Sequence, residues 1–429
     1  MSARSDPAAI YIHQLGMIAE ERGDYQQAEE RYRTSLTINE ELGNRSGIAT
    51  SHHQLGIIAQ QRGDYQQAEE RYRTSLTINE ELGNRSGIAT TYHQLGTIAQ
   101  ERGDYQQAEE RYRTSLTINE ELGNRSGIAT SHHQLGIIAQ HRGDYQQAEE
   151  RYRTSLTIEE ELGDRSGIAI SYGQLGTIAQ ERGDYQQAEE RYRASLTVFE
   201  ELGNRSAIAT TYGQLGTIAQ ERGDDQQAEE RYRACLTIFE ELGNRSGIAT
   251  TYHQLGIIAQ LRGDDQQAEE RYRTSLTIFE ELGNRSGIAI SHHQLGIIAQ
   301  QRGDYQQAEE RYRTSLTIEE ELGNRSGIAT TYGRLGALRT EQQRPSEGVS
   351  YMLQALALVV EIGSPPGAIL YWLGRQRDLL GDDAFRSLLD DMLSHDVAAM
   401  VMDLTQPATE PLPPEESTGP ENPISPDQT

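Results

Sequence analysis

Apolar residues follow a helical period along most of this chain, and the whole pattern recurs every 40 residues. In the copy spanning residues 87–126, Tyr92, Leu95 and Ala99 are separated by three or four positions. This spacing places them on one face and predicts an amphipathic helix over about 87–102. Polar residues occupy most other positions, so this helix has one face to bury.

A second helix in each copy is predicted by the residues that flank it. Gly103 can adopt the left-handed conformation that ends the first helix. Asp104 can cap the second helix, with Gln107 as the returning half of a capping box. Gly123 ends this helix in turn, and Ser126 can cap the first helix of the next copy.

Neither helix can bury its apolar face alone, so neighbouring copies must stack. The sequence therefore predicts an all-α solenoid of antiparallel helix pairs. Nine pairs are expected over 8–363, of which the ninth is diverged, after a short lead at 1–7. A degenerate tenth pair and a capping helix are expected over 364–404. The proline-rich acidic tail at 405–429 is expected to be disordered.

Charge narrows the range of partners. The net charge is −27, and all 39 basic residues are arginine. Acidic residues recur in every copy, so the surface is expected to repel phosphate, which disfavours nucleic acid and anionic membranes as partners. A basic or neutral segment of a protein or peptide fits this surface better. Self-association remains possible because the copies are nearly identical.

The single cysteine, Cys235, replaces a serine of other copies and excludes a disulfide within the chain. Its expected role is that of a small buried side chain. Met1–Pro7 leads into the first helix without the apolar run of a signal peptide, and no stretch approaches the length of a transmembrane helix. These features favour the cytoplasm.

Little in the chain resembles catalytic chemistry. Without lysine there is no Walker A motif and no Schiff-base lysine, and no G-x-S-x-G motif occurs. The pair Glu109-Glu110 recurs in the copies, which indicates a solvated face rather than a general acid and base. We therefore expect neither an enzyme nor a cofactor.

Histidine recurs at one position of the first helix and, in some copies, at the position before it. These residues are His13, His53, His93, His133, His253 and His293, preceded in three copies by His52, His132 and His292. Metal binding is disfavoured because packed helices stand about 8–10 Å apart and adjacent side chains diverge. Polar lining or packing is the expected role. A pH-sensitive surface is the alternative, since a histidine ladder would charge near neutrality.

The repeated copy resembles the tetratricopeptide repeat. The residues that carry the resemblance are Tyr92, Leu95-Gly96, Ala99, Ala108 and Tyr112. Two features depart from that pattern, since Glu120 replaces the usual helix-ending proline and the period is 40 residues instead of about 34. The longer form is similar to the repeats of spindle-orientation scaffold proteins, kinesin light chains and bacterial signalling arrays.

The resemblance implies a right-handed superhelix in which the first helices line a concave groove for a peptide or helix. Within this chain the copies differ mainly at four positions of the first helix, separated by steps of three, four and four residues, which form one stripe. With the adjacent glutamine position, this stripe is the expected binding surface. Its residues are Thr50, His53, Ile57, Gln60, Gln61, Thr90, His93, Thr97, Gln100, Glu101, Thr130, His133, Ile137, Gln140, His141, Thr250, His253, Ile257, Gln260 and His293.

A non-catalytic adaptor that binds a peptide or helix is the function these features favour. The alternative is a ligand-sensing regulatory module of a bacterial signalling system, coupled to a separate switch or effector domain. The differences between copies can instead reflect a few mutations in a young array. A second cluster of differences, at Phe199, Phe239 and Phe279, is expected to pack between copies.

Overall fold

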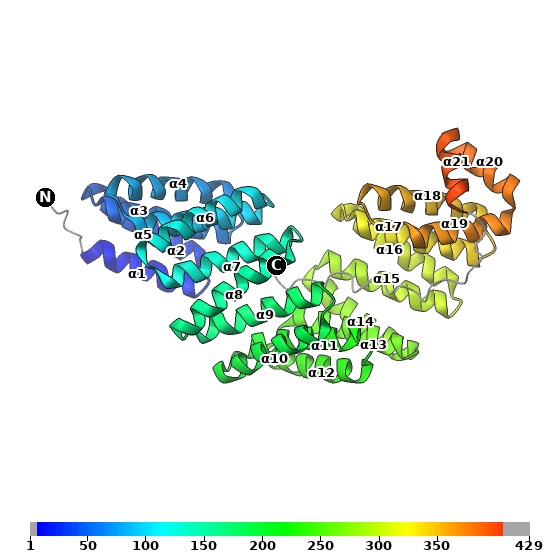
Figure 1. The fold of residues 1–429 in the computed structure, drawn as a ribbon, viewed down its shortest axis with the longest axis horizontal. Helices are drawn as coiled ribbons and strands as arrows, with labels where there is room; N and C mark the ends of the chain where they lie inside the picture. Colours follow the sequence, from blue (N-terminus) through cyan, green and yellow to red (C-terminus); the bar gives the residue numbers. More distant parts are fainter. Residues whose placement is uncertain (1–6, 406–429) are drawn as a thin grey trace. The chain divides into compact units, whose positions relative to one another are not determined.

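The computed structural model describes residues 7–405, which form α-helices and no strand (Figure 1). The chain divides into two compact units between Asn204 and Arg205. Unit 1 contains α1 (Pro7–Glu21), α2 (Tyr25–Glu41), α3 (Arg45–Gln61), α4 (Tyr65–Leu82), α5 (Arg85–Glu101), α6 (Tyr105–Leu122), α7 (Arg125–His141), α8 (Tyr145–Leu162), α9 (Arg165–Glu181) and α10 (Tyr185–Leu202). Unit 2 contains α11 (Arg205–Glu221), α12 (Asp225–Leu242), α13 (Arg245–Leu261), α14 (Asp265–Leu282), α15 (Arg285–Gln301), α16 (Tyr305–Leu322), α17 (Arg325–Glu341), α18 (Pro345–Glu361), α19 (Gly367–Leu380), α20 (Asp382–Met392) and α21 (His395–Leu404).

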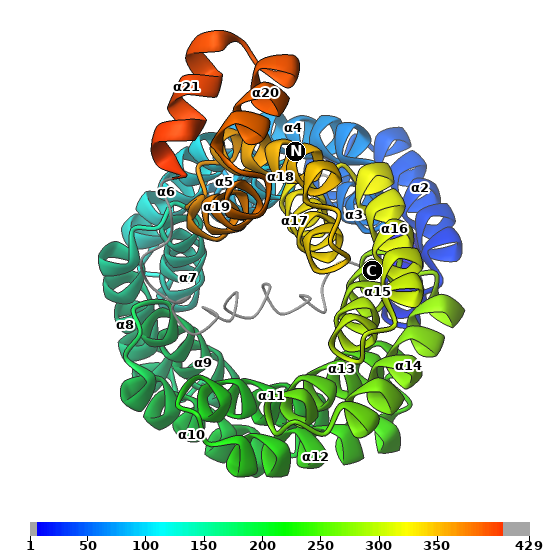
Figure 2. The ribbon, with the colours of Figure 1, turned by 90° about the vertical axis from the view of Figure 1, so that its right-hand side faces the viewer.

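Consecutive helices within each unit form antiparallel pairs, and each pair packs on the next. In unit 1, α3, α5, α7 and α9 lie on the inner side of the curve, and α4, α6, α8 and α10 lie on the outer side (Figure 2). In unit 2, α11, α13 and α15 lie inside, and α12, α14 and α16 lie outside. We call the first and second helices of a pair its inner and outer helix. This is the predicted all-α solenoid of helix pairs.

Glycine and short polar side chains set the helix ends. Gly103 and Gly123 adopt left-handed conformations, with φ of 75° and 65°, as predicted. Asp104 caps α6 by accepting a hydrogen bond from the Gln107 backbone N–H at 3.0 Å. The capping box lacks its returning half, because the Gln107 side chain donates to the Asp104 carboxylate at 3.3 Å. The Asp104 N–H instead donates to the carbonyl of Ala99 at 2.8 Å.

The predicted cap at Ser126 is wrong. Asn124 caps α7 by accepting from the Gly127 N–H at 3.2 Å, so Ser126 lies inside the helix. The inner helices therefore begin two residues earlier than predicted from apolar spacing. Asn124 is itself oriented by the outer helix that precedes it, since its side-chain N–H donates to Asn119 Oδ1 at 2.8 Å.

Close approach of the two helices of a pair depends on one glycine. A Cβ on Gly96 would lie 2.8 Å from two carbons of the Tyr112 ring, which is shorter than side chains tolerate. Tyr112 is fully buried beneath it, beside Ala99 and Ala108. A buried hydrogen bond from Ser115 Oγ to the Ala89 carbonyl, at 2.9 Å, ties the same two helices together.

Outer carboxylates are neutralised by arginine. Glu69 on α4 pairs with Arg73 one turn later at 2.5 Å and with Arg102 of the next pair at 2.8 Å. The same triad recurs in unit 1 around Glu109 and Glu149. Because one carboxylate bridges two repeats, these ion pairs fasten neighbouring pairs on the outer side. Each such exposed pair contributes less than about 1 kcal/mol, but the contacts recur along the stack.

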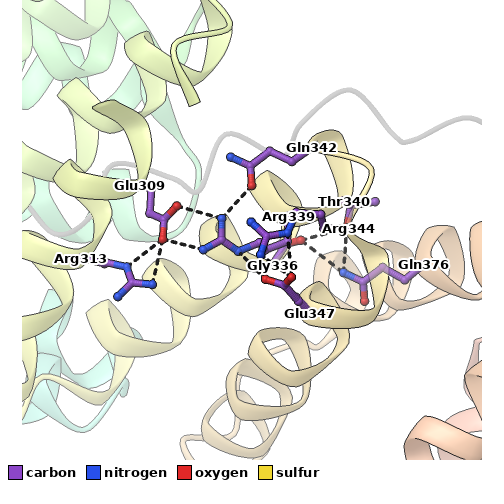
Figure 3. A network of polar contacts seen from close by, with 9 residues as sticks. All are labelled: Glu309, Arg313, Gly336, Arg339, Thr340, Gln342, Arg344, Glu347 and Gln376. Atoms are coloured by element: carbon purple, nitrogen blue, oxygen red, sulfur yellow. Dashed lines mark hydrogen bonds and ion pairs between the residues drawn. The ribbon is translucent and has the colours of Figure 1, made fainter. Parts of the chain in front are cut away.

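The ninth pair, α17 and α18, contains a polar network around an arginine that replaces a small inner residue (Figure 3). Arg339 occupies a position that is alanine in other copies and is 6% exposed. Its guanidinium donates to both carboxylate oxygens of Glu309, at 2.9 and 2.5 Å, and to Gln342 Oε1 at 2.7 Å. Gln376 from α19 is fully buried and donates to Thr340 Oγ1 at 2.9 Å. The network joins the regular copies of unit 2 to its last helices.

The last helices of unit 2 bury a core of their own. Leu373, Phe385, Leu389 and Val401 are 0–1% exposed and pack together from α19, α20 and α21. Thr405, the first residue of the expected tail, is buried and donates to the Val401 carbonyl at 2.7 Å. The expected lead through residue 6 and the expected disordered tail from residue 406 lie outside the described residues.

The phenylalanine cluster packs as predicted. Phe199, Phe239 and Phe279 are 8%, 9% and 0% exposed. A Cβ on Gly247 or Gly287 would lie 2.5–2.6 Å from the ring of Phe239 or Phe279, so each ring lies flat against the next inner helix. Phe239 and Phe279 are therefore part of the contact between pairs of unit 2, and none of the three rings forms an exposed patch.

Candidate functional site

The predicted stripe in unit 1 lies on inner helices α3, α5 and α7 and is open to solvent along two of its edges. Thr50, Thr90 and Thr130 are exposed at one edge, and Gln61, Glu101 and His141 are exposed at the other. Between them lie half-buried side chains, which are His53, Ile57, Gln60, His93, Thr97, Gln100, His133, Ile137 and Gln140. The inner surface thus combines exposed threonine with a partly apolar floor.

In unit 2 the corresponding threonine and histidine side chains lie deeper. Thr250, Ile257 and Gln260 are half-buried on α13. His253 and His293 are only 6% and 7% exposed, so little of either imidazole is available to a ligand. Sequence comparison of the copies does not distinguish these two histidines from the half-buried ones of unit 1.

The recurring glutamine is held in a fixed orientation by tyrosine. The Tyr72 hydroxyl donates to Gln60 Oε1 at 3.0 Å, and the same bond links Tyr112 to Gln100 at 3.0 Å. It recurs at Gln140 and Gln260. With the carbonyl oxygen occupied, the amide N–H groups point along the stack, and Gln60 Nε2 donates to Glu101 Oε1 of the next pair at 3.0 Å. The structure therefore brings two predicted stripe residues into direct contact.

The histidines pack against the same tyrosines. The His53 and Tyr72 ring centroids are 5.3 Å apart, and His93 and Tyr112 repeat this contact at 5.3 Å. Burial lowers the pKa of His53 to about 4, and it lowers the pKa of His253 to about 4. The expectation that the ladder charges near neutrality is therefore wrong, because desolvation opposes the imidazolium form.

His52, His132 and His292 stand where other copies have tyrosine, and a neighbouring arginine adds to burial in lowering the pKa of each. Burial, followed by the charge of Arg151, lowers the pKa of His132 to about 4. Arg151 Nη1 lies 3.2 Å from His132 Nδ1, so a proton on the imidazole would face a fixed guanidinium. Tyrosine at this position receives the arginine over its ring instead, as Arg111 does 5.8 Å from the Tyr92 centroid.

His141 has a different role. Its ring stacks on Tyr105 of the preceding pair, with centroids 4.9 Å apart and an interplanar angle of 14°. Tyr145, the equivalent of Tyr105 one copy later, donates through its hydroxyl to Glu181 at 3.1 Å. This edge position of the stripe therefore links neighbouring pairs while remaining exposed.

The described helices bear on metal binding and on nucleophilic chemistry at cysteine. Residues 7–405 contain no group of three His, Cys, Asp or Glu side chains placed to hold a metal ion. Burial raises the pKa of the Cys235 thiol to about 11, and the sulfur lies 3.5 Å from Thr251 Oγ1. The thiolate needed for nucleophilic chemistry is thus disfavoured. None of the helices in this part of the chain combines the length and apolar character needed to cross a bilayer.

Sequence reasoning missed two buried carboxyl positions. Glu159 replaces an asparagine of other copies and is 7% exposed, accepting from Ser155 Oγ at 2.9 Å and Ser171 Oγ at 2.7 Å. Burial, opposed by these hydroxyls, raises its pKa. Glu319 replaces the same asparagine in unit 2 and is also buried. Both positions could have been found from the sequence, because a glutamate there replaces an asparagine on the buried face of the outer helix.

The sequence profile of the tetratricopeptide repeat family matches the chain in successive overlapping pairs of copies. The matched residues are 6–81, 47–121, 87–161, 127–201, 167–241, 207–281, 247–321 and 287–361. The chain therefore belongs to the tetratricopeptide repeat family. Such repeats form protein-interaction modules, and the fold is generally a non-catalytic scaffold. No curated protein sequence matches the chain.

Solved structures share the fold at low sequence identity. The apo form of the quorum sensor NprR from B. thuringiensis is 13% identical with a TM-score of 0.56, covering 81% of this chain and 97% of that one. The apo form of RapI is 15% identical with a TM-score of 0.52, covering 64% and 99%. A signal transduction ATPase with a tetratricopeptide repeat sensor, from Pyrococcus horikoshii, is 14% identical with a TM-score of 0.59, covering 74% and 48%.

Proposed function

We propose that the protein is a non-catalytic adaptor that binds a segment of a partner protein on its inner helices. The observation that carries the proposal is the row of oriented glutamine amides, Gln60, Gln100 and Gln140, each held by a tyrosine hydroxyl. A fixed amide offers hydrogen bonds to a peptide backbone without first losing rotamer freedom. The exposed threonines and half-buried isoleucines beside it supply polar and apolar contacts.

The surface chemistry limits the kind of partner. The chain has a net charge of −27, so a basic or neutral segment is favoured over nucleic acid or an anionic membrane. The one cysteine is free and buried, which suits a reducing compartment, and we expect the protein to act in the cytoplasm. Near-identical copies also allow self-association, which sedimentation analysis at several concentrations would detect.

Two sets of threonines provide a matched test. Thr50, Thr90 and Thr130 are exposed on inner helices, whereas Thr77, Thr117 and Thr157 are exposed on outer helices. We expect the triple change of the inner threonines to arginine to abolish recovery of a protein partner. The same change of the outer threonines adds the same charge and should leave recovery intact. Equal recovery by both variants, with circular dichroism showing both folded, would contradict the proposal.

A second function is favoured by the fold likeness to sensors. The solved structures with TM-scores of 0.56 and 0.59 include a quorum sensor and a sensor-bearing ATPase. In this alternative the inner face binds a small peptide, and the resulting change in helix packing regulates a separate switch or effector domain. Small-angle scattering with and without the bound peptide separates the two, since a sensor changes its dimensions on binding and a rigid adaptor does not.

A further inference from the structure

The first helix pair exposes the surface that every later pair of unit 1 buries. Ile58 on α3 is 1% exposed, because it packs in one cluster with Tyr32 of the pair before it. Ile18 occupies the same position on α1 and is 43% exposed. On the outer helices, Ile38 of the first pair is half-buried, whereas its equivalent Ile78 is 5% exposed. No helix pair precedes α1 in the described residues, so this stacking face has no cover there.

A tyrosine makes this face unlike a regular joint between pairs. Tyr11 is 63% exposed and lies one turn from Leu15 and two turns from Ile18, so the three side chains form one stripe of α1. Later copies have serine or threonine at the position of Tyr11, where the side chain is 0–4% exposed. That small side chain meets the preceding outer helix, as Ser171 Oγ does in donating to Glu159 at 2.7 Å. A tyrosine in this space leaves no room for a further regular pair.

The face also carries an unpaired cation. In the next two pairs, Arg62 forms an ion pair with Glu29 of the preceding pair, and Arg102 does so with Glu69. Arg22 is the equivalent residue of the first pair, and it is exposed and forms no ion pair within residues 7–405. The first pair therefore lacks both the apolar and the charged contact that its successors make. The end of a solenoid is normally polar, so an apolar end indicates an interaction surface.

We propose that this face, formed by Tyr11, Leu15, Ile18 and Ile38, binds the same face of a second copy of the chain in a two-fold dimer. The proposal goes beyond the adaptor function, because it concerns the end of the stack and not the inner face. The stripe continues the apolar surface that joins the pairs of unit 1, and a two-fold contact needs only this one surface. Each copy is acidic, with a net charge of −27, and so offers carboxylates to the unpaired Arg22 of the other.

Other occupants within the chain fit this face less well. At the far end of unit 2, Leu373 and Phe385 are already buried in the core of α19, α20 and α21, so no stacking face of this kind is open there. Residues 1–6 contain Met1 and Ala3 as their only apolar residues and supply little surface for the stripe. A head-to-tail contact would also add copies without end, whereas the two-fold contact stops at the dimer.

The size of the face sets the expected affinity. With 15 residues, α1 is about 22 Å long, and two helices side by side span about 20 Å. The face therefore measures about 450 Å² on each chain. Contacts of this size lie at the small end of specific interfaces, so we expect a dissociation constant on the order of micromolar.

Sedimentation velocity of the full chain, from about 1 to about 100 µM, tests the proposal over that range. We expect a monomer at the lowest concentration, a growing share of dimer as the concentration rises, and no larger species. Because two acidic chains repel each other, added salt should strengthen an apolar contact between them. Weakening by salt would show that the association is ionic and would contradict the proposal.

A double variant and a matched control locate the contact. Tyr11→Ser places on α1 the residue that the next copy has at Ser51, and Ile18→Gln makes the exposed centre of the stripe polar. Leu261→Gln removes an apolar side chain that is 54% exposed on α13, and other copies have glutamine there. We expect the double variant to weaken the dimer by about tenfold or more, and Leu261→Gln to leave it unchanged. Circular dichroism checks that both variants are folded.

Four results would overturn the proposal. The first is a chain that stays monomeric throughout the concentration range, and the second is equal weakening by the double variant and by Leu261→Gln. The third is growth beyond the dimer that Met400→Gln abolishes, because Met400 is 55% exposed on α21 and this result would indicate a head-to-tail contact. The fourth is a dimer that forms only after residues 2–6 are removed, which would show that the leading segment covers the face. None of these results bears on partner recovery through the inner threonines, so the proposed function is tested separately.

Discussion

Arg339 donates hydrogen bonds through both of its terminal nitrogens to the carboxylate of Glu309, across the joint between the eighth and ninth helix pairs. In the other copies an alanine occupies the position of Arg339, and an arginine three residues later in the chain reaches the equivalent carboxylate from the helix end. The ninth pair thus keeps the outer ion pair but moves its cation into the interior. Only 7% of the Arg339 side chain is exposed.

Arg339→Ala should destabilise unit 2 by about 1–3 kcal/mol, because it removes the buried guanidinium from Gln342 and leaves Glu309 with Arg313 as its remaining cation. Arg302→Ala breaks the equivalent pair one copy earlier, where the arginine is 40% exposed, and should cost less than about 1 kcal/mol. Urea unfolding of both variants measures the difference. Equal losses of stability would show that the burial of Arg339 does not strengthen its ion pair with Glu309.

The buried histidines should make the fold sensitive to acid. An unfolded imidazole has a pKa near 6.5, whereas burial lowers the pKa of His253 to about 4 and that of His293 to about 3. The folded state therefore binds fewer protons between these values, so stability is retained above pH 6.5 and falls as the pH drops toward 4. For His253 the full loss amounts to about 3 kcal/mol.

His253→Phe isolates this effect. Phenylalanine keeps a ring against Tyr272, whose centroid lies 5.3 Å away, and removes the buried Nδ1 that has no hydrogen-bond partner. We expect the variant to match or exceed wild-type stability at pH 7.5 and to exceed it further at pH 5. Thermal unfolding at the two pH values measures this, and a difference that does not change with pH would contradict the explanation.

Glu159 should respond to pH in the opposite sense. Its folded pKa is raised by burial, so the folded state binds a proton more readily than the unfolded chain does. Stability should therefore increase as the pH falls through the folded pKa and level off below the unfolded value. Glu159→Gln is expected to be more stable than wild type at pH 7 and equal to it near pH 3. Glu160→Gln removes a charge from the exposed neighbouring position and serves as the matched control.

Two glycines of α9 should respond oppositely to the same substitution. A Cβ on Gly176 would lie 2.8 Å from the ring of Tyr192, whereas a Cβ on Gly173 would approach only Ser195 Oγ, at 3.7 Å. Gly176→Ala should destabilise the protein by about 1–3 kcal/mol. Gly173→Ala should stabilise it by about 0.5–1 kcal/mol, because it restricts the unfolded chain at no steric cost. Denaturant unfolding of the two variants measures both changes in stability. Destabilisation by both would show that the space beside Gly173 is too small for a methyl group.

The elements predicted best are those that depend on local chemistry. The left-handed glycines Gly103 and Gly123 and the cap at Asp104 follow from residue type alone, and the structure confirms them. The cap at Asn124 was missed because serine and asparagine both cap helices, and residue type alone favoured neither Asn124 nor Ser126. The choice does not depend on Asn119, since Asn244 caps α13 in the same way with Phe239 at the equivalent position.

The sequence predicted which positions form the stripe, but only the structure shows which side chains these positions contact. Helical spacing places His53, Gln60 and Gln61 on one face of α3, and their partial or full exposure agrees with that. Spacing does not show that His53 lies against Tyr72 or that Gln60 reaches Glu101, because these contacts involve other helices. Whether the stripe binds a partner remains a prediction. The role of Arg339 was also hidden, since its partner Glu309 lies 30 residues earlier.

The left-handed glycines at both ends of each outer helix bear on how such a chain can change in length. Gly63 and Gly83, with φ of 74° and 64°, flank the outer helix α4 and allow turns that depend only on residues within one copy. Within the regular part of each unit, the contacts between copies are made with an immediate neighbour of nearly the same sequence. A recombination event that adds or removes 40 residues would reproduce joints the array already contains, so the number of helix pairs can vary over evolutionary time without the invention of a new interface.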